Sequence, residues 1–305
     1  MELRNLNDLA FSEFFVQFNY EKESRFSSSL FLGAEVRGAL MMKSKHMFCL
    51  NKKNFDNCKE CLFRYKCNYA LLFETPLPRQ SDVMKKYGEI PHPFALAVFH
   101  KKETLIVRFV LFGEYIDSFP FIYLALSEAM KTKGLKMADV RNFDVSILHN
   151  DSIETNYTRK SVNELHSNTR HPGGFRVNFI SPLRIKYRNK LVNQTHFEFE
   201  YLIRNLLRRF SLLSYFYGGE KLKLDFDSVT SKASEVKIAE SDLKWLELDR
   251  FSMRTKQTSL LGGIIGSIAL GEDASDFLQL LTLGHYTQVG KNTSFGHGYF
   301  EIVEN

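Results

Sequence analysis

One order of predicted elements, strand-helix-strand-strand-helix-strand, occurs twice along the chain and limits the folds that it can adopt. In the first copy, alternating apolar residues predict a strand over 14–20, and apolar residues three or four apart predict a helix that ends near Lys43. A hairpin over 94–112, a helix that begins after Ser118 and a strand over 143–148 complete the first copy.

The second copy begins with a strand whose apolar side alternates with a basic side. A helix over 198–217 follows, then two strands around 243–252 and 258–270, a short helix and a last strand over 299–303. Two copies of this order predict an α+β protein with two tandem ferredoxin-like (RRM-like) βαββαβ domains. Each would have an antiparallel sheet with helices on one face.

A chain of 305 residues is long enough for two such domains. We expect an N-terminal domain over 1–152, with a Cys-rich insertion over about 44–93 where prolines interrupt regular structure. A polar linker or loop over 153–172 would lead into a C-terminal domain over 173–305, which contains a glycine-rich loop.

The charge is concentrated in two stretches. The whole chain has a net charge of +6, but residues 36–66 carry eight basic and two acidic side chains, and residues 151–210 carry eleven and five. The rest of the chain is therefore net acidic. Concentrated positive charge favours an anionic partner such as nucleic acid.

The start of the chain does not resemble a targeting peptide, and no apolar run approaches the length of a bilayer span. We therefore expect a cytoplasmic protein with no membrane partner. In that compartment the four cysteines would be reduced or metal-bound rather than paired in disulfides.

The four cysteines lie within nineteen residues, and two of them have the spacing of a zinc knuckle. One interpretation is a closed, structural site for zinc or another soft metal. The other is a redox pair or reduced thiols packed in the insertion. The residues concerned are Cys49, Cys58, Cys61 and Cys67.

His46 follows the first predicted helix and is surrounded in sequence by basic residues. Imidazole transfers protons near neutral pH, and nearby cations could hold a phosphate against it. The alternatives are a solvated surface histidine or a metal ligand beside Cys49.

A glycine-rich segment, Gly284 to Ile302, precedes and includes the last strand. It carries Lys291, Ser294 and four glycines, two of which are Gly296 and Gly298. Glycines allow positive φ and close backbone approach, so the loop would suit phosphates and sugars, or it is simply a tight turn. For His297, backbone packing or RNA contact is more plausible than proton transfer.

Two further basic groups could follow a phosphate backbone. One is the basic side of the first strand of the second copy, and the other is the turn over 252–257; the alternative in both cases is a solvated surface. Asp225 and Asp227 could bind a divalent metal, but two surface carboxylates in a turn are the better interpretation. The basic residues are Arg176, Arg184, Lys186, Arg188, Arg254 and Lys256.

Several loose motifs occur in order and together resemble a known family. They include FISPLRIK at 179–186, LGGIIG at 261–266, GKNTSFGHG at 290–298, and LGAEVRGAL at 32–40, which contains Arg37. The combination resembles the CRISPR precursor-RNA-processing endoribonucleases of the RAMP superfamily. The cysteine cluster and the segment Tyr69 to Glu74 resemble a cysteine-containing branch of that family.

The resemblance implies cleavage of CRISPR repeat RNA without a catalytic cofactor, by attack of a ribose 2′-hydroxyl that leaves a 2′,3′-cyclic phosphate. His46 would be the acid–base residue, with Lys52 or Lys45 as the cation, and Arg37 and the glycine loop among the RNA contacts. Zinc would be structural only. The competing hypotheses are a non-catalytic RNA-binding subunit of a CRISPR effector complex and a protein-interaction module built on the insertion.

Overall fold

The computed structural model describes residues 9–21, 32–51, 57–85, 90–101, 103–150, 152–165, 173–252 and 257–304. The chain forms two compact units. The N-terminal unit comprises Ala10–Lys160 with Phe216–Gly218, and the C-terminal unit comprises Ser161–Tyr215 and the described chain from Gly219 onward, with Leu9.

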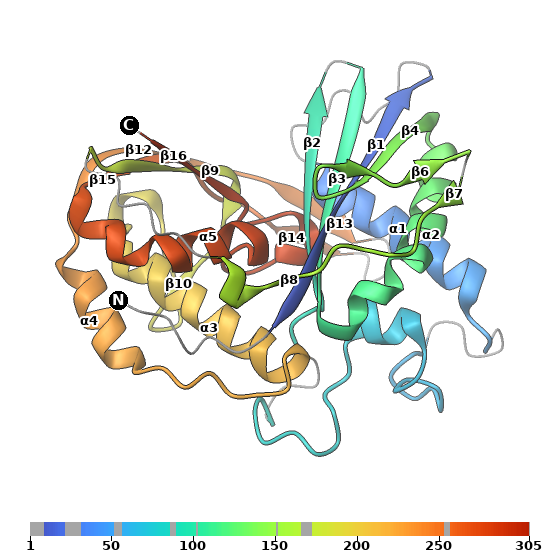
Figure 1. Ribbon diagram of the computed structural model, residues 1–305, viewed down its shortest axis with the longest axis horizontal. Helices are drawn as coiled ribbons and strands as arrows, with labels where there is room; N and C mark the ends of the chain where they lie inside the picture. Colours follow the sequence, from blue (N-terminus) through green and yellow to red (C-terminus); the bar gives the residue numbers. More distant parts are fainter. Residues whose placement is uncertain are drawn as a thin grey trace. The chain divides into compact units, whose positions relative to one another are not determined.

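The N-terminal unit has an antiparallel sheet in the order β2-β3-β1-β4, with the short β5 paired to β4 (Figure 1). Helices α1 and α2 pack on each other against the core of this sheet. This is the strand order of a ferredoxin-like domain, as the sequence predicted. The elements are β1 (Ala10–Tyr20), α1 (Gly33–Phe48), β2 (Phe94–Lys101), β3 (Thr104–Phe112), α2 (Phe119–Lys131), β4 (Leu135–Asn142) and β5 (Val145–Ser146).

The predicted end of the first helix was wrong, because α1 continues to Phe48. Lys43 does not disturb the core: its side chain is about one-third exposed, at 31%, and its Nζ lies 3.5 Å from a carboxylate oxygen of Glu128 on α2. The small Ser44 takes the buried position instead. A lysine can line an apolar surface with its stem while its charge reaches water, so it does not end a helix. His46 therefore lies in the last turn of α1 rather than after it.

The C-terminal unit repeats the fold, with an antiparallel sheet in the order β12-β15-β9-β16. Helices α3 and α5 lie together on one face of this sheet (Figure 1), and Gly284 of α5 lies directly against Leu206 of α3 and Phe300 of β16. The elements are β9 (Phe175–Leu183), α3 (Phe199–Tyr217), β12 (Ile238–Leu246), β15 (Gly263–Leu270), α5 (Leu278–Thr287) and β16 (Phe300–Glu304).

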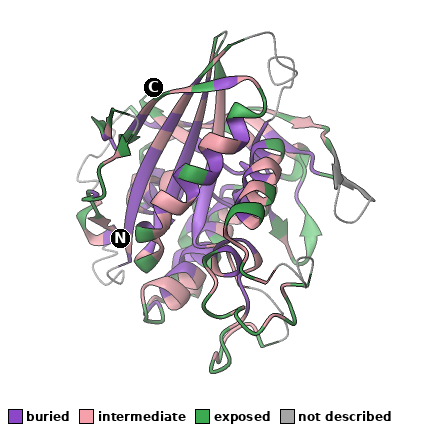
Figure 2. Ribbon diagram, turned by 90° about the vertical axis from the view of Figure 1, so that its right-hand side faces the viewer, coloured by how far each residue is buried: buried purple, intermediate pink, exposed green. Residues whose placement is uncertain are grey.

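Burial follows the predicted patterns. The alternating residues Phe14, Val16 and Phe18 of β1 are fully buried, and so are Leu202 and Phe210 on the apolar stripe of α3. Figure 2 shows buried residues along the strands and on parts of the helices, with exposed residues on other parts of the same helices. Helices α2 and α3 are thus amphipathic and bury one side in the core of their unit.

Two regions differ from the sequence prediction. Helix α4 (Phe226–Glu235) was not predicted, and the expected strand around 243–252 is divided between β12 and β13 (Asp249–Ser252), which pairs with β14 (Gln257–Leu260). The strand expected over 143–148 also lies earlier, as β4. It ends at Asn142 because Phe143 has a positive φ of 52°.

The remaining elements are short. Among the described residues, no helix is both long and apolar enough to cross a membrane. The two-residue strands are β6 (Leu148–His149), β7 (Ser152–Ile153), β8 (Lys160–Ser161), β10 (Lys186–Tyr187) and β11 (Lys190–Leu191), and the short helical turns are Ala70–Glu74, Gly113–Ser118, Val162–Glu164, Gln194–His196, Glu272–Phe277 and Thr293–Phe295.

Asp225 caps helix α4, because its Oδ1 accepts a hydrogen bond of 3.1 Å from the amide of Ser228. The replacement Asp225→Ala is expected to lower the free energy of unfolding by about 1 kcal/mol, since one amide of the first turn loses its acceptor. Urea denaturation measures this loss. Asp227→Ala, in the same turn but outside the cap, is the control and should change stability by less than about 0.5 kcal/mol. Equal losses in the two variants would contradict the capping role.

Candidate nucleic-acid interface

The glycine-rich loop of the C-terminal unit closes against the end of β9. The amide of Lys291 donates to the carbonyl of Arg184 at 2.8 Å, and the amide of Gly298 donates to the carbonyl of Pro182 at 3.0 Å. Gly290 has a φ of +86°, and a Cβ at this position would lie 2.5 Å from the Arg184 carbonyl oxygen. The loop therefore needs glycine at 290 because another backbone passes too close for a side chain.

This closure gathers four cations from three segments: Arg184 and Lys186 after β9, Arg208 on α3, and Lys291 in the loop. We call them the cation cluster. Partial burial lowers the pKa of Lys291, and the positive charges of Lys186, Arg184 and Arg208 lower it further. Like charges held this close favour a bound anion, because an anion would relieve their repulsion.

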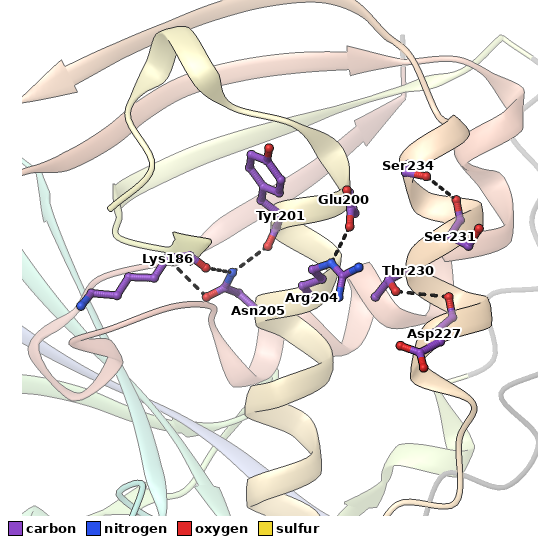
Figure 3. A network of polar contacts seen from close by, with 9 residues as sticks. All are labelled: Lys186, Glu200, Tyr201, Arg204, Asn205, Asp227, Thr230, Ser231 and Ser234. Carbon is purple, nitrogen blue, oxygen red and sulfur yellow. Dashed lines mark hydrogen bonds and ion pairs between the residues drawn. The ribbon is translucent and has the colours of Figure 1, made fainter. Parts of the chain in front are cut away.

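Asn205 fixes Lys186 to α3 (Figure 3). Its Nδ2 donates to the carbonyl of Lys186 at 3.1 Å and to the carbonyl of Tyr201 at 2.7 Å. Tyr187 stacks on Tyr201, with ring centroids 4.1 Å apart, so it is not turned outward toward a base. The exposed Arg188 lies over the Tyr187 ring, 5.2 Å from its centroid. The hairpin of β10 and β11 is thereby held against the helix.

The predicted basic side of the strand is not continuous. Arg176 lies at the other end of β9, where its Nη2 forms an ion pair of 2.7 Å with Glu240. Arg184 belongs to the cation cluster and donates from Nη1 to the carbonyl of Gly262 at 2.5 Å. Arg254 and Lys256 fall outside the described residues.

The other predicted residues of the loop are internal. Ser294, Gly296 and Gly298 are buried, whereas Lys291 is exposed. The loop thus presents its lysine to solvent, and the glycines set the course of the backbone. A role for Ser294, Gly296 or Gly298 in RNA binding stays a prediction.

Two buried side chains hold the ends of the loop. The Nε2 of His297 lies 2.7 Å from the carbonyl oxygen of Leu261, and burial lowers the pKa of His297 to about 4, so the ring is neutral. At the other end, Nε of Arg209 donates to the carbonyl of Thr287 at 2.5 Å, at the end of α5. His297 is therefore placed to pack against backbone, the first of its two predicted roles.

The N-terminal unit positions the predicted catalytic residues on the last turn of α1. His46 is exposed, and Lys45 is half-buried with its Nζ 5.6 Å from the centroid of the Tyr69 ring. Lys52 lies outside the described residues. Arg37 is 6% exposed, and its Nη2 lies 3.2 Å from Nε2 of His92. This position gives Arg37 a packing role and leaves little of it for an RNA phosphate to contact.

The predicted zinc site is not supported. Cys49, Cys58, Cys61 and Cys67 line one cavity of about 300 Å³ and are free thiols. Burial raises the pKa of Cys58, which favours its protonated form. Among the described residues, which include all four cysteines, no group of three or more His, Cys, Asp or Glu side chains is arranged to hold a metal ion. Tetrahedral zinc needs ligands that converge on one point, and these four thiols do not form such a group.

Two residues of the interface were missed by sequence reasoning. Arg208 joins the cation cluster, and Asn205 anchors Lys186. Both lie outside the apolar stripe of the helix predicted over 198–217. Because they are three residues apart, they lie on the same polar side of that helix. That spacing was the available signal, but it does not say which loop the polar side faces.

Comparison with known proteins agrees with these features. The family model of the CRISPR-associated endoribonuclease Cas6 matches residues 177–300, and a model described as the N-terminal domain of AF_1859_N matches residues 9–168. A comparison with curated protein sequences finds no match. Residues 177–300 thus have the sequence pattern of a Cas6 endoribonuclease domain. The assignment of the chain to a cysteine-containing branch of that family stays a prediction.

Solved structures of Cas6 share the fold over nearly the whole chain. A Cas6 of Thermus thermophilus is 14% identical, with a TM-score of 0.56, and the match covers 97% of this chain and 99% of that one. A partial Cas6-RT-Cas1–Cas2 complex is 13% identical with a TM-score of 0.58, covering 98% of this chain and 47% of that chain. At this identity the likeness establishes the tandem ferredoxin-like fold.

Proposed function

We propose that this protein cleaves CRISPR repeat RNA to produce mature guide RNA, by a reaction that does not require a metal ion. The observation that carries the proposal is the exposed position of His46 on the last turn of α1, with Lys45 beside it. The match of residues 177–300 to the family model of the Cas6 endoribonucleases supports the reaction class. Cleavage would take place in the cytoplasm.

In the proposed reaction, the ribose 2′-oxygen forms a bond to the adjacent phosphorus while the bond from phosphorus to the 5′-oxygen breaks. The 2′-hydroxyl loses its proton, and the 5′-oxygen gains one. The products are a 2′,3′-cyclic phosphate and a 5′-hydroxyl. His46 carries one of these proton transfers, and a nearby cation, Lys45 or Lys52, stabilises the negative charge that develops on the phosphate oxygens.

The cation cluster supports the RNA-binding part of the proposal. Arg184, Lys186, Arg208 and Lys291 present positive charge at the glycine loop, where exposed lysines can follow a phosphate backbone. We include Arg176 and Arg188 as weaker contacts, because one is paired with Glu240 and the other lies over Tyr187.

The double replacement Lys186→Ala with Lys291→Ala is expected to weaken RNA binding at every sequence, because these lysines would contact phosphates. The slope of log affinity against log salt should fall in magnitude by about 1.4 for single-stranded contacts, about 0.7 for each lost contact. Filter binding at several salt concentrations measures the slope. The matched control is Lys232→Ala with Lys237→Ala, two exposed lysines at α4. An equal change in the control would show that only the net charge matters.

The proposed function is tested by incubating the protein with cognate repeat RNA in excess EDTA and determining the end groups of the products. Cleavage at one position, giving a cyclic phosphate and a 5′-hydroxyl, is the expected result. Products with a 5′-phosphate, or activity that EDTA abolishes, would contradict the mechanism. Binding without any cleavage would favour the competing hypothesis of a non-catalytic guide-RNA-binding subunit.

We also infer that the protein works beside other CRISPR proteins. The fold matches a chain in a Cas6-RT-Cas1–Cas2 complex, which shows that a Cas6 can be part of a larger assembly. For this chain, a stable association with effector-complex subunits is a separate prediction. Co-purification from the native cell, with and without ribonuclease treatment, distinguishes a direct association from one bridged by RNA.

A further inference from the structure

A cavity of about 300 Å³ lies at the end of α1 in the N-terminal unit. Its wall is formed by Phe48 at the end of α1, by residues of the Cys-rich segment (49–51 and 58–70) and by Phe121 of α2. The cavity is large enough for a small organic ligand, and its surface is mostly apolar. The cysteines of the predicted zinc motif line it without forming a metal site among the described residues, and the proposed reaction does not use it.

Beside the four cysteine thiols and a few aliphatic groups, the lining contains three kinds of side chain that could recognise a ligand. The rings of Phe63 and Tyr69 supply flat apolar surfaces, and Asn68 supplies an amide donor and acceptor. Arg64 and Lys66 supply positive charge. The described lining contains no aspartate or glutamate, so the ligand that matches it is flat, carries hydrogen-bonding edges and is attached to a negative charge.

A nucleotide of RNA has this chemistry. Its base has a π-face that stacks on aromatic rings, its edge forms hydrogen bonds, and its phosphate is anionic. An apolar peptide side chain would match the apolar wall. It would not supply the negative charge that Arg64 and Lys66 favour, and the described lining has no carboxylate of its own. A metal ion would need converging thiols, which the described residues lack.

The cavity adjoins the turn that carries the proposed catalytic histidine. Cys49, which lines the cavity, follows His46 by three residues, and its amide bonds to the carbonyl of Lys45 at 3.0 Å. Lys45 in turn lies over the ring of Tyr69, a residue of the wall. A nucleotide in the cavity would therefore lie one helical turn from His46.

We propose that this cavity binds one unpaired nucleobase of the RNA substrate, close to the phosphate that is cleaved. The proposal rests on the proposed function, and it adds a specificity pocket formed by the Cys-rich segment. Phe63 is the principal stacking residue, because its side chain is 53% exposed and lines the open cavity. Bound RNA would shield this ring from water.

The test uses repeat RNA in which the fluorescent adenine analogue 2-aminopurine replaces one unpaired nucleotide at a time, with the attacking 2′-hydroxyl removed to prevent cleavage. Stacking on a ring quenches this base, so one position is expected to lose fluorescence when the wild-type protein binds. Phe63→Ala should abolish that quenching and weaken binding by roughly 5- to 150-fold, the effect of losing one base–aromatic stack. Phe63→Tyr should retain both.

Leu62→Ala is the matched control, because Leu62 is 94% exposed, adjacent to Phe63 and outside the cavity lining. It should bind and quench like the wild type. Thermal unfolding of all three variants shows whether each is folded. The proposal is overturned if no position is quenched, or if Phe63→Ala binds RNA as tightly as Leu62→Ala.

Two other outcomes are distinguishable. If the wild-type protein quenches one position but never cleaves unmodified RNA, the pocket stands and the proposed function fails. If the purified protein contains one zinc ion per chain and Phe63→Ala leaves RNA affinity unchanged, the cavity is a metal site and the proposal of a base pocket is overturned.

Discussion

Replacement of His46 by alanine is expected to lower the rate of repeat-RNA cleavage by about 100- to 10,000-fold, the usual contribution of a positioned acid or base. The affinity for RNA should stay close to that of the wild type. His46 is exposed at the end of α1, so its loss removes no core packing and should not change folding. Single-turnover cleavage and filter binding, measured on the same preparation, separate the two effects.

His149→Ala is the control for this experiment. His149 is another exposed histidine of the N-terminal unit, and its Nε2 lies 2.9 Å from a carboxylate oxygen of Glu154. The rate of this variant should be within about twofold of the wild type. A rate for His46→Ala equal to that of the wild type would show that another residue transfers the proton. His166 and His171, outside the described residues, would then be the next to test.

The stability of the C-terminal unit is expected to fall steeply in mild acid because of His297. Burial lowers the pKa of this histidine from 6.5 to about 4 in the folded protein. The unfolded chain binds a proton between these two values while the folded chain does not, so acid favours unfolding. The stabilisation is complete above pH 6.5 and is lost as the pH falls toward 4. Its full size is about 3 kcal/mol, at 1.36 kcal/mol for each pKa unit.

Urea denaturation between pH 7.5 and pH 4 measures this loss, and His297→Gln is the matched variant. Glutamine cannot titrate but keeps an amide donor that can reach toward the Leu261 carbonyl. The variant is expected to be less stable at pH 7.5 and to lose about 3 kcal/mol less than the wild type on acidification. Parallel stability profiles for the two proteins would contradict a buried, neutral His297.

Prediction of the fold from the sequence succeeded where the local pattern was long. The stripe of α3 extends over nineteen residues, and the alternation of β1 over most of a strand, so each identifies both the element and its buried side. Helix α4 was missed because it has ten residues and buries only Val229, Thr230 and Ala233. The Asp225 cap, which stands just before this helix, was the signal that could have located it.

Prediction of the site depended on contacts between distant segments. The sequence identified Lys291, Arg184 and Lys186 as basic residues of interest, but it could not bring them together or add Arg208. Arg37 illustrates the reverse case. From the sequence, Arg37 was predicted to contact RNA because it is basic. The packing of α1 shows instead that Arg37 is buried beside His92.

Local sequence patterns were enough to predict the order of the main elements, the buried side of most of them and the resemblance to CRISPR precursor-RNA-processing endoribonucleases, because these follow from the spacing of neighbouring residues. Which charged groups meet depends instead on tertiary contacts. The cation cluster forms only when the loop of Gly290 closes on the Arg184 carbonyl, and the thiols of Cys49, Cys58, Cys61 and Cys67 line a cavity instead of converging on a metal. Both outcomes depend on how the backbone of one segment passes another, which local periodicity does not encode.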